Sequence, residues 1–227
     1  MRFHSWVSSV AIALVAGLAS SCATVARSNS SPDVEPPGDP REALLDAVGF
    51  GEADAVERLL TAGGEADQLT PEGFTLLMIA AEDGHDPVVA TLLAHGANPN
   101  AKTDQAVTPL ILASSRGNVS TAEELIVRGA DTTAVTRAGV TPLMGAAAAG
   151  HADAVKMLIR HGAVIDARDE GGRTALMLAA ANGHADVVAV LLANGARRDS
   201  RDHDGNTAAS LAKKGHHADV EQLLRGS

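Results

Sequence analysis

A period of 33 residues runs through most of this 227-residue chain and limits what it can fold into. Threonine recurs five times at one phase, and a glutamate takes that phase one period earlier: Glu42, Thr75, Thr108, Thr141, Thr174 and Thr207. Alanine follows five residues after all six positions, and glycine follows nine residues after the first five. A fixed period of this length predicts a solenoid of stacked units that bury their apolar faces against one another.

Each unit is predicted to hold two helices joined by a tight turn. In the fourth unit, a short helix is expected over residues 141–149 and a second helix with one apolar face over residues 152–160. Gly150 and Gly162 supply the left-handed residues that end these two helices. Ala106 replaces the glycine that marks the turn before the second, fourth, fifth and sixth units, which predicts a looser turn in the third unit.

Several short motifs resemble those of ankyrin repeats, in phase over residues 38–227: Thr108-Pro109-Leu110, Thr141-Pro142-Leu143, Gly150-His151 and Gly183-His184-Ala185-Asp186-Val187-Val188. The resemblance implies an all-α solenoid of about six helix-turn-helix units, with projecting β-turn fingers and a concave binding face. The family's usual histidine after Thr-Pro-Leu is replaced here, so we expect helix starts that are packed more than hydrogen-bonded. The replacements are Met78, Ile111, Met144, Met177 and Ser210. The repeats are expected at approximately 41–70, 71–103, 104–136, 137–169, 170–202 and 203–227.

The N-terminal segment has the pattern of an export signal. Arg2 is followed by an uncharged run from Val7 to Ala19, which is too short for a membrane-spanning helix. The sequence Leu18-Ala19-Ser20-Ser21-Cys22 then resembles a bacterial lipoprotein signal, which implies removal of residues 1–21 and lipidation of Cys22. Two alternatives remain: cleavage after Ala23 or Ala26, which frees a soluble exported protein, and retention of the segment as an uncleaved anchor.

Residues 22–40 are predicted to form a disordered tether, because this stretch rich in serine and proline has little apolar surface to bury. The repeat domain then occupies residues 41–227. We therefore expect a membrane-anchored lipoprotein of the cell envelope, with a soluble periplasmic or secreted protein as the alternative.

Charge and motif content argue against two broad classes of function. With 18 basic and 28 acidic side chains, the chain has a formal net charge of −10, which disfavours nucleic acid as a partner. No phosphate-binding loop, metalloprotease motif or nucleophile elbow is present, so we expect no catalytic residue, no cofactor and no metal site. Loop carboxylates such as Asp169 and Asp202 are interpreted as solvated turn residues.

Two sets of histidines recur at fixed positions in the repeat. One set lies ten residues after the repeated threonine. The family resemblance implies that the side chains of this set form hydrogen bonds with the backbone at the turn between the two helices of a repeat. A metal site at the adjacent pair His216 and His217 is disfavoured, because neighbouring residues on a helix point apart. The first set is His85, His151, His184 and His217, and the second set is His95 and His161.

The resemblance also implies which positions contact a partner. These are the finger positions one, three and four residues before the threonine and the helix positions seven and eight residues after it. One residue before it lie Phe74, Val107, Val140, Arg173 and Asn206. We expect the first three to form an exposed apolar row that binds the partner, or alternatively to pack finger against finger.

The remaining candidate contacts are charged. The N-terminal half of the groove is expected to be acidic because of Glu72, Glu82, Asp83 and Asp104, while Arg116 and Arg137 lie centrally. We therefore predict a monomeric, non-catalytic module that binds another protein and is held at a membrane through Cys22. The alternative is a soluble inhibitor or immunity-type protein that blocks one enzyme or toxin through its acidic groove.

Overall fold

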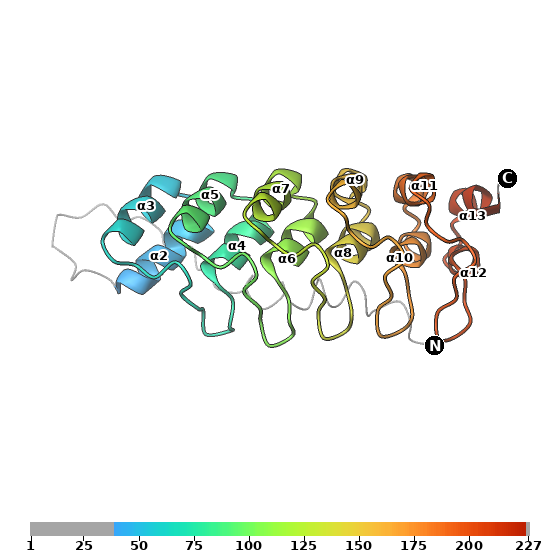
Figure 1. Cartoon of the computed structure of the whole chain (residues 1–227), viewed down its shortest axis with the longest axis horizontal. Helices are drawn as coiled ribbons and strands as arrows, with labels where there is room; N and C mark the ends of the chain where they lie inside the picture. Colours follow the sequence, from blue (N-terminus) through green and yellow to red (C-terminus); the bar gives the residue numbers. More distant parts are fainter. Residues whose placement is uncertain (1–38, 226–227) are drawn as a thin grey trace, which may run out of the picture. The chain divides into compact units, whose positions relative to one another are not determined.

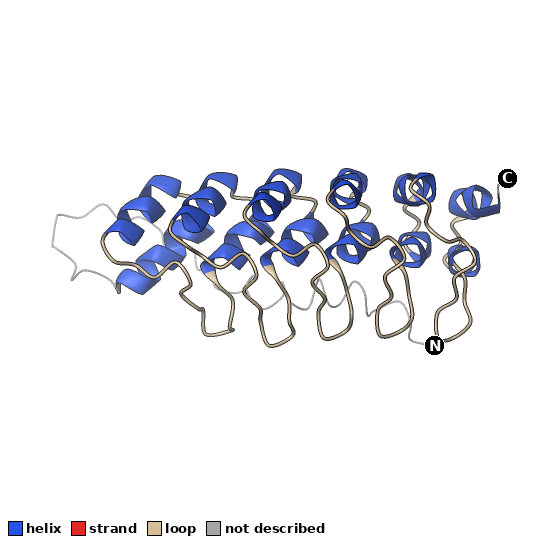
Figure 2. Ribbon diagram, in the orientation of Figure 1, coloured by secondary structure: helices blue, strands red, loops and turns tan. Residues whose placement is uncertain are grey.

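The computed structural model describes residues 39–225, which form twelve α-helices in six consecutive pairs (Figure 1). The pairs are α2 (Pro40–Gly49) with α3 (Ala53–Thr61), α4 (Leu76–Asp83) with α5 (Asp86–Ala94), α6 (Pro109–Arg116) with α7 (Val119–Val127), α8 (Pro142–Ala149) with α9 (Ala152–Arg160), α10 (Ala175–Ala181) with α11 (Ala185–Ala193), and α12 (Ala208–Lys214) with α13 (Ala218–Arg225). This part of the chain contains no strand, and its one isolated β-bridge joins Leu69 to Thr75 (Figure 2).

The helices form two parallel rows. Each helix contacts its partner in the pair and the equivalent helix of the neighbouring pair. Figure 1 shows the inner row, α2 to α12, with the loops that precede its helices projecting as fingers from one side. The outer row, α3 to α13, lies on the side away from the fingers, at the top of the view. The predicted all-α solenoid of about six helix-turn-helix units is confirmed.

Close approach within the inner row depends on alanine. The alanine five residues after the repeated threonine is buried in all six repeats. Its methyl group lets the neighbouring inner helices pack at short range, and larger apolar side chains fill the space between the two rows. These buried alanines are Ala47, Ala80, Ala113, Ala146, Ala179 and Ala212.

The repeated threonine begins each inner helix from the second repeat onward. In α8, the Thr141 hydroxyl accepts a hydrogen bond of 3.1 Å from the Met144 backbone amide, and the threonines of the other four repeats do the same. The sixth repeat differs from the expectation that the helix starts are packed more than hydrogen-bonded. There the Ser210 hydroxyl also accepts a hydrogen bond of 2.9 Å from the Thr207 amide. In the first repeat, the carboxylate of Asp39 takes over the cap.

The turn at Ala106 is not looser than the others, so that prediction is wrong. Ala106 adopts the left-handed conformation, with φ of 57°, that glycine adopts elsewhere at this position. Its amide donates to Thr103 O at 2.8 Å, which matches the bond of 2.9 Å from Gly139 to Thr136 in the next finger. The hydrogen bonds of the finger therefore offset the cost of about 1–2 kcal/mol for a left-handed residue with a Cβ.

A contact that we call the inter-repeat clamp joins each repeat to the next. It consists of the glycine nine residues after the threonine and the side chain, in the following repeat, that lies over it. His184 lies over Gly150, where a Cβ would be only 2.7 Å from Nδ1, and its Nε2 donates to Ala148 O at 2.9 Å. The same side-chain bond to the preceding repeat is made by His85 and His217, so the predicted backbone role is confirmed for these three histidines. His151, the fourth of the predicted set, lies over Gly117 without making this bond.

Two positions show how the clamp depends on its neighbours. Asn118 replaces the histidine in the third repeat, lies over Gly84, and donates from Nδ2 to the backbone oxygens of Ala81 and Glu82. His216 replaces the glycine in the last described repeat, where its φ of 61° keeps the left-handed turn. A Cβ is tolerated there because no later side chain of residues 39–225 lies over it.

The second set of histidines links the outer row. His95 Nε2 lies 2.9 Å from Glu57 Oε2, and His161 Nε2 lies 3.6 Å from Glu123 Oε1, each acid belonging to the preceding repeat. These exposed contacts join neighbouring repeats along the outer row of helices, in addition to the clamp.

Gly150→Ala is expected to destabilise the domain more than Gly162→Ala. Both glycines have φ of 84°, but a Cβ at Gly150 meets His184, whereas nothing lies within 4 Å of a Cβ at Gly162. We expect both variants to lose about 1–2 kcal/mol from the left-handed backbone and Gly150→Ala to lose at least about 1 kcal/mol more. Urea unfolding followed by far-ultraviolet circular dichroism measures both losses; equal losses would contradict the clamp.

Candidate functional site

The finger positions directly before the threonine are not an exposed apolar row. Only 9% of Phe74 and 4% of Val107 is exposed, and Val140 is half-buried. In the finger of Phe74, the Thr70 amide donates to Phe74 O at 2.8 Å, which folds the finger back and turns this residue inward at its base. The expected exposure of Phe74 and Val107 is therefore wrong, and their burial supports the alternative, a packing role.

Arg173 and Asn206 occupy the same phase and also hold the fingers. Arg173 Nε donates to Asp169 Oδ2 at 2.7 Å, and Asn206 Nδ2 donates to Asp202 Oδ2 at 3.0 Å. Asp169 and Asp202 are buried, and Oδ1 of Asp169 accepts bonds from the amides of its own turn. The interpretation of these two carboxylates as solvated turn residues is therefore wrong, because they organise the turns from inside.

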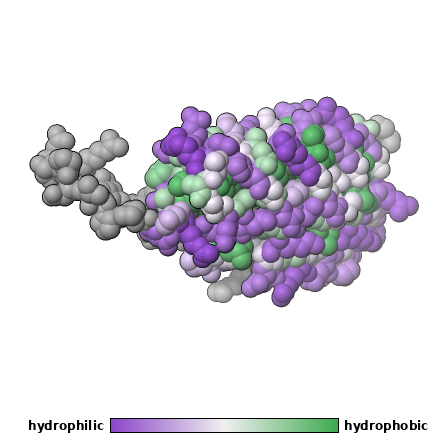
Figure 3. Space-filling view, turned by 60° about the vertical axis from the view of Figure 1, so that its left-hand side comes forward, coloured by the Kyte–Doolittle hydropathy of each residue, from purple (hydrophilic) through white to green (hydrophobic). Residues whose placement is uncertain are grey.

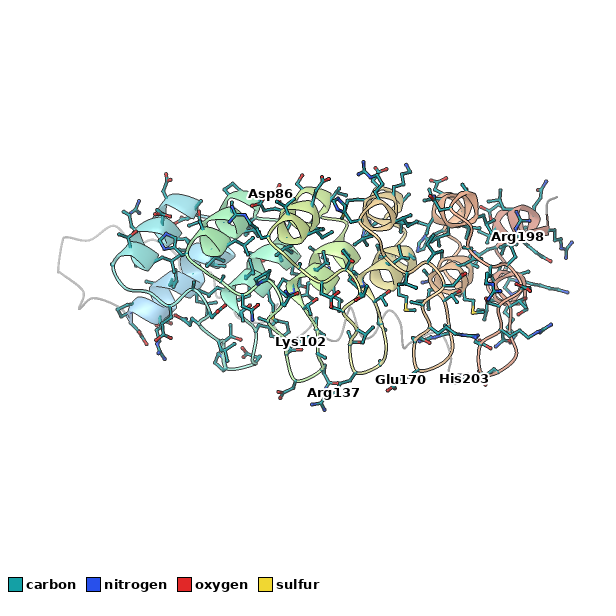
Figure 4. All side chains as sticks on the ribbon, viewed as in Figure 1. Asp86, Lys102, Arg137, Glu170, Arg198 and His203 are labelled. Atoms are coloured by element: carbon teal, nitrogen blue, oxygen red, sulfur yellow. The ribbon has the colours of Figure 1, made fainter. Side chains whose placement is uncertain are left out.

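The tips of successive fingers are bonded to one another through the backbone. The Arg137 amide donates to Gln105 O at 2.9 Å, the Glu170 amide to Ala138 O at 3.0 Å and the His203 amide to Gly171 O at 2.9 Å. Figure 4 shows the labelled Arg137, Glu170 and His203 on successive fingers. Arg137 is exposed at this edge, as are the acidic side chains of Glu72 and Asp104.

The ends of the inner helices form a second exposed part of the predicted surface. Eight residues after the repeat position lie Phe50, Asp83, Arg116, Ala149 and Asn182, and all five are exposed. We call these five residues the groove row. Because the inner helices stack in register, the row crosses five consecutive repeats on one side of the domain.

Ion pairing divides the acidic candidates of this surface. Glu82 Oε1 lies 2.5 Å from Arg116 Nη2, and its side chain is only 13% exposed, so its charge is largely neutralised within the domain. Asp83 remains exposed, and none of the ion pairs found in residues 39–225 involves it. Glu82 therefore positions Arg116, whereas Asp83 faces solvent.

Sequence reasoning did not single out three exposed residues of this surface, namely Ala149, Asn182 and the only aromatic one, Phe50. Its side chain is 74% exposed, although the other aromatic side chain of residues 39–225, Phe74, is buried. The signal was present in the sequence, because Phe50 lies eight residues after Glu42 and thus at a predicted contact position.

Charge is distributed unevenly along the domain. Residues 39–136 hold 16 acidic and 5 basic side chains, a net charge of −11, whereas residues 137–225 hold 10 acidic and 11 basic side chains, a net charge of +1. Within the acidic half, hydrogen bonds from the hydroxyl and amide of Thr133 hold the pKa of Asp131 below its usual value. The N-terminal three repeats therefore attract cations.

Other kinds of site find little support. Residues 39–225 contain no group of three His, Cys, Asp or Glu side chains placed to hold a metal ion. A hollow lies on the outer helices, away from the groove row, and is lined by Val119, Asp153, Lys156, Arg160 and Asn194. Within it, Lys156 already pairs with Asp153 at 3.0 Å. No helix in the described part of the chain is long and apolar enough to cross a bilayer.

Comparisons with known proteins agree with the repeat pattern. A family model described as ankyrin repeats (3 copies) matches residues 18–103, 44–136, 110–202 and 143–227. A comparison with curated proteins gave no match.

Val107→Asp is expected to destabilise the domain strongly, because a carboxylate would replace a buried side chain at the base of a finger. We expect a loss of at least about 2 kcal/mol, measured by urea unfolding. Val135→Asp is the matched control, since 46% of Val135 is exposed, and should change stability by less than about 0.5 kcal/mol. A normal stability of Val107→Asp would return Val107 to the candidate binding surface.

Proposed function

The chain belongs to the ankyrin repeat family, and we propose that it is a non-catalytic module that binds another protein in the bacterial cell envelope. Ankyrin repeats are generally protein–protein interaction modules, and their fold is typically non-catalytic. The partner binds across the groove row and the exposed finger tips.

The observation that carries the binding proposal is the exposure of the groove row over five consecutive repeats. The inter-repeat clamp lies directly beside this row and fixes one repeat against the next, so little order has to be gained on binding. With helix layers about 10 Å apart, five repeats span about 40 Å, which is long enough for an interface of about 800 Å² per partner.

The candidate residues have two different roles in this proposal. Phe74, Val107, Arg173 and Asn206 shape the fingers from inside, and Glu82 holds Arg116 in place. The exposed side chains touch the partner, and they are Phe50, Asp83, Arg116, Ala149 and Asn182 in the groove row, with Glu72, Asp104 and Arg137 on the fingers.

The envelope setting rests on the sequence of the N-terminal segment. Cys22 and the expected tether lie outside the described residues, so their support is the lipoprotein-like pattern that ends at Cys22. A lipid on this cysteine would hold the repeat domain at a membrane surface, where it captures a protein of the same compartment.

Ala149→Arg is expected to abolish capture of the partner. Ala149 is exposed at the end of an inner helix, so a long cationic side chain there blocks the groove row and leaves the fold intact. Ala94→Arg is the matched control, because Ala94 is exposed at the end of an outer helix. Tagged variants expressed in the source organism are purified from the envelope, and bound proteins are quantified by mass spectrometry. Equal capture by both variants would contradict binding through the groove row.

Cys22→Ser is expected to release the protein from the membrane fraction, because serine cannot carry the thioether-linked lipid. Fractionation and gel mobility measure the change, and tryptophan emission tests cleavage, since Trp6 is the only tryptophan of the chain. A lipoprotein should be membrane-bound without tryptophan emission. A wild-type protein that is already soluble would favour the inhibitor or immunity-type alternative, and membrane-bound protein that retains Trp6 would indicate an uncleaved anchor.

A further inference from the structure

An exposed aromatic side chain stands at the N-terminal end of the groove row. Phe50 is 74% exposed, whereas the equivalent positions in the next four repeats are acidic, basic, small and amide side chains. Figure 3, in which the N-terminal end of the domain comes forward, shows apolar patches separated by polar surface. An isolated apolar residue needs no explanation by itself, so the surroundings of Phe50 decide what it does.

The backbone that carries Phe50 is held firmly. The Phe50 amide donates to Asp46 O at 2.9 Å, and Gly49 O accepts a bond of 3.2 Å from His85 Nε2 of the next repeat. Gly51 then lies under the His85 ring, where a Cβ would be 2.9 Å from Nδ1. The backbone that carries the ring is therefore fixed before binding, which lowers the entropic cost of ordering this site.

Two exposed carboxylates lie near Phe50 on this surface. Asp46 lies one turn earlier on α2, on the same side of the helix as Phe50, and Asp83 occupies the equivalent of the Phe50 position in the next repeat, about 10 Å along the row. Neither takes part in any ion pair found in residues 39–225, in contrast to Glu82 beside Asp83, which Arg116 neutralises. An exposed aromatic ring with two solvent-facing carboxylates nearby is thus available to a cationic side chain.

We propose that Phe50, Asp46 and Asp83 bind an arginine or lysine side chain from a basic segment of the protein partner. The alkyl stem and charged head pack over the ring as a cation–π contact, and the two carboxylates accept hydrogen bonds from the head group. This inference rests on the proposed function, because it gives the chemistry of the partner at one end of the same surface.

The charge of the domain favours a basic partner over a second copy of the chain. Residues 39–136 carry a net charge of −11, so two copies that met through this end would repel each other. The same charge repels an anionic lipid surface. A basic protein segment instead gains attraction over three repeats before it contacts the ring.

Binding of two labelled peptides, nona-arginine and nona-glutamate, tests the proposal. Fluorescence anisotropy is measured with the full-length protein in a non-ionic detergent at low salt. We expect nona-arginine to bind and nona-glutamate not to bind. Phe50→Ala should raise the dissociation constant for nona-arginine about two- to fivefold, the range of an exposed cation–π contact. Asp46→Asn with Asp83→Asn should raise it at least as much and weaken its dependence on salt.

Matched controls separate the local site from the total charge. Leu69→Ala removes another exposed apolar side chain, and Asp54→Asn removes an exposed carboxylate of the same repeat from an outer helix. Neither should change the dissociation constant measurably. Equal effects of Asp54→Asn and Asp83→Asn, or an unchanged affinity of Phe50→Ala, would overturn the proposal. A dimer in light scattering that Phe50→Ala dissolves would overturn it in favour of a second copy.

The failure of this inference and that of the proposed function have different signatures. If Ala149→Arg loses the envelope partner while Phe50→Ala retains it at wild-type level, the groove binds protein but Phe50 is not its anchor. If neither the wild type nor Phe50→Ala retains an envelope protein, the proposed function itself is wrong.

Discussion

The packing of one side chain over one glycine sets the spacing of the whole repeat array. Each clamp combines a left-handed glycine, a side chain from the next repeat that lies on its Cα, and, in four of the five clamps, a hydrogen bond from that side chain to a backbone oxygen of the preceding repeat. Glycine is needed there for its conformation and for its lack of a Cβ. His216 separates these two requirements: its φ of 61° is left-handed although it has a Cβ, and no side chain of residues 39–225 lies over it.

The same clamp connects the fold to the surface on which binding is proposed. The groove row lies one residue before the clamp glycine in each repeat, so the contact that joins two repeats also fixes the exposed side chains beside it. The fingers are held by separate means, namely buried carboxylates within a finger and backbone bonds between tips. Rigid spacing along the row is what lets side chains of different repeats act on one partner.

The periodicity was sufficient to predict the helices and the turns between them, because both follow from local rules repeated in phase. The backbone bonds of three histidines were instead implied by the resemblance to ankyrin repeats. The inward orientation of Phe74 and Val107 was not predictable in this way. Phase shows which residues are equivalent, but the backbone bond that folds the finger back decides which way they face. The turn at Ala106 was also not predictable from residue type, because the hydrogen bonds of the finger outweigh the preference of alanine for a right-handed conformation. Phe50 was predictable by phase, because it lies eight residues after Glu42, which takes the threonine position in the first repeat.

Hydrogen–deuterium exchange of the full-length protein, with and without the envelope protein that it captures, tests the account most directly. Binding through the groove row predicts slower exchange at residues 49–51, 82–84, 115–117, 148–150 and 181–183 and at the finger tips, with no change in the outer helices α5, α7 and α9. Protection confined to those outer helices, with unchanged exchange at the ends of the inner helices, would contradict it.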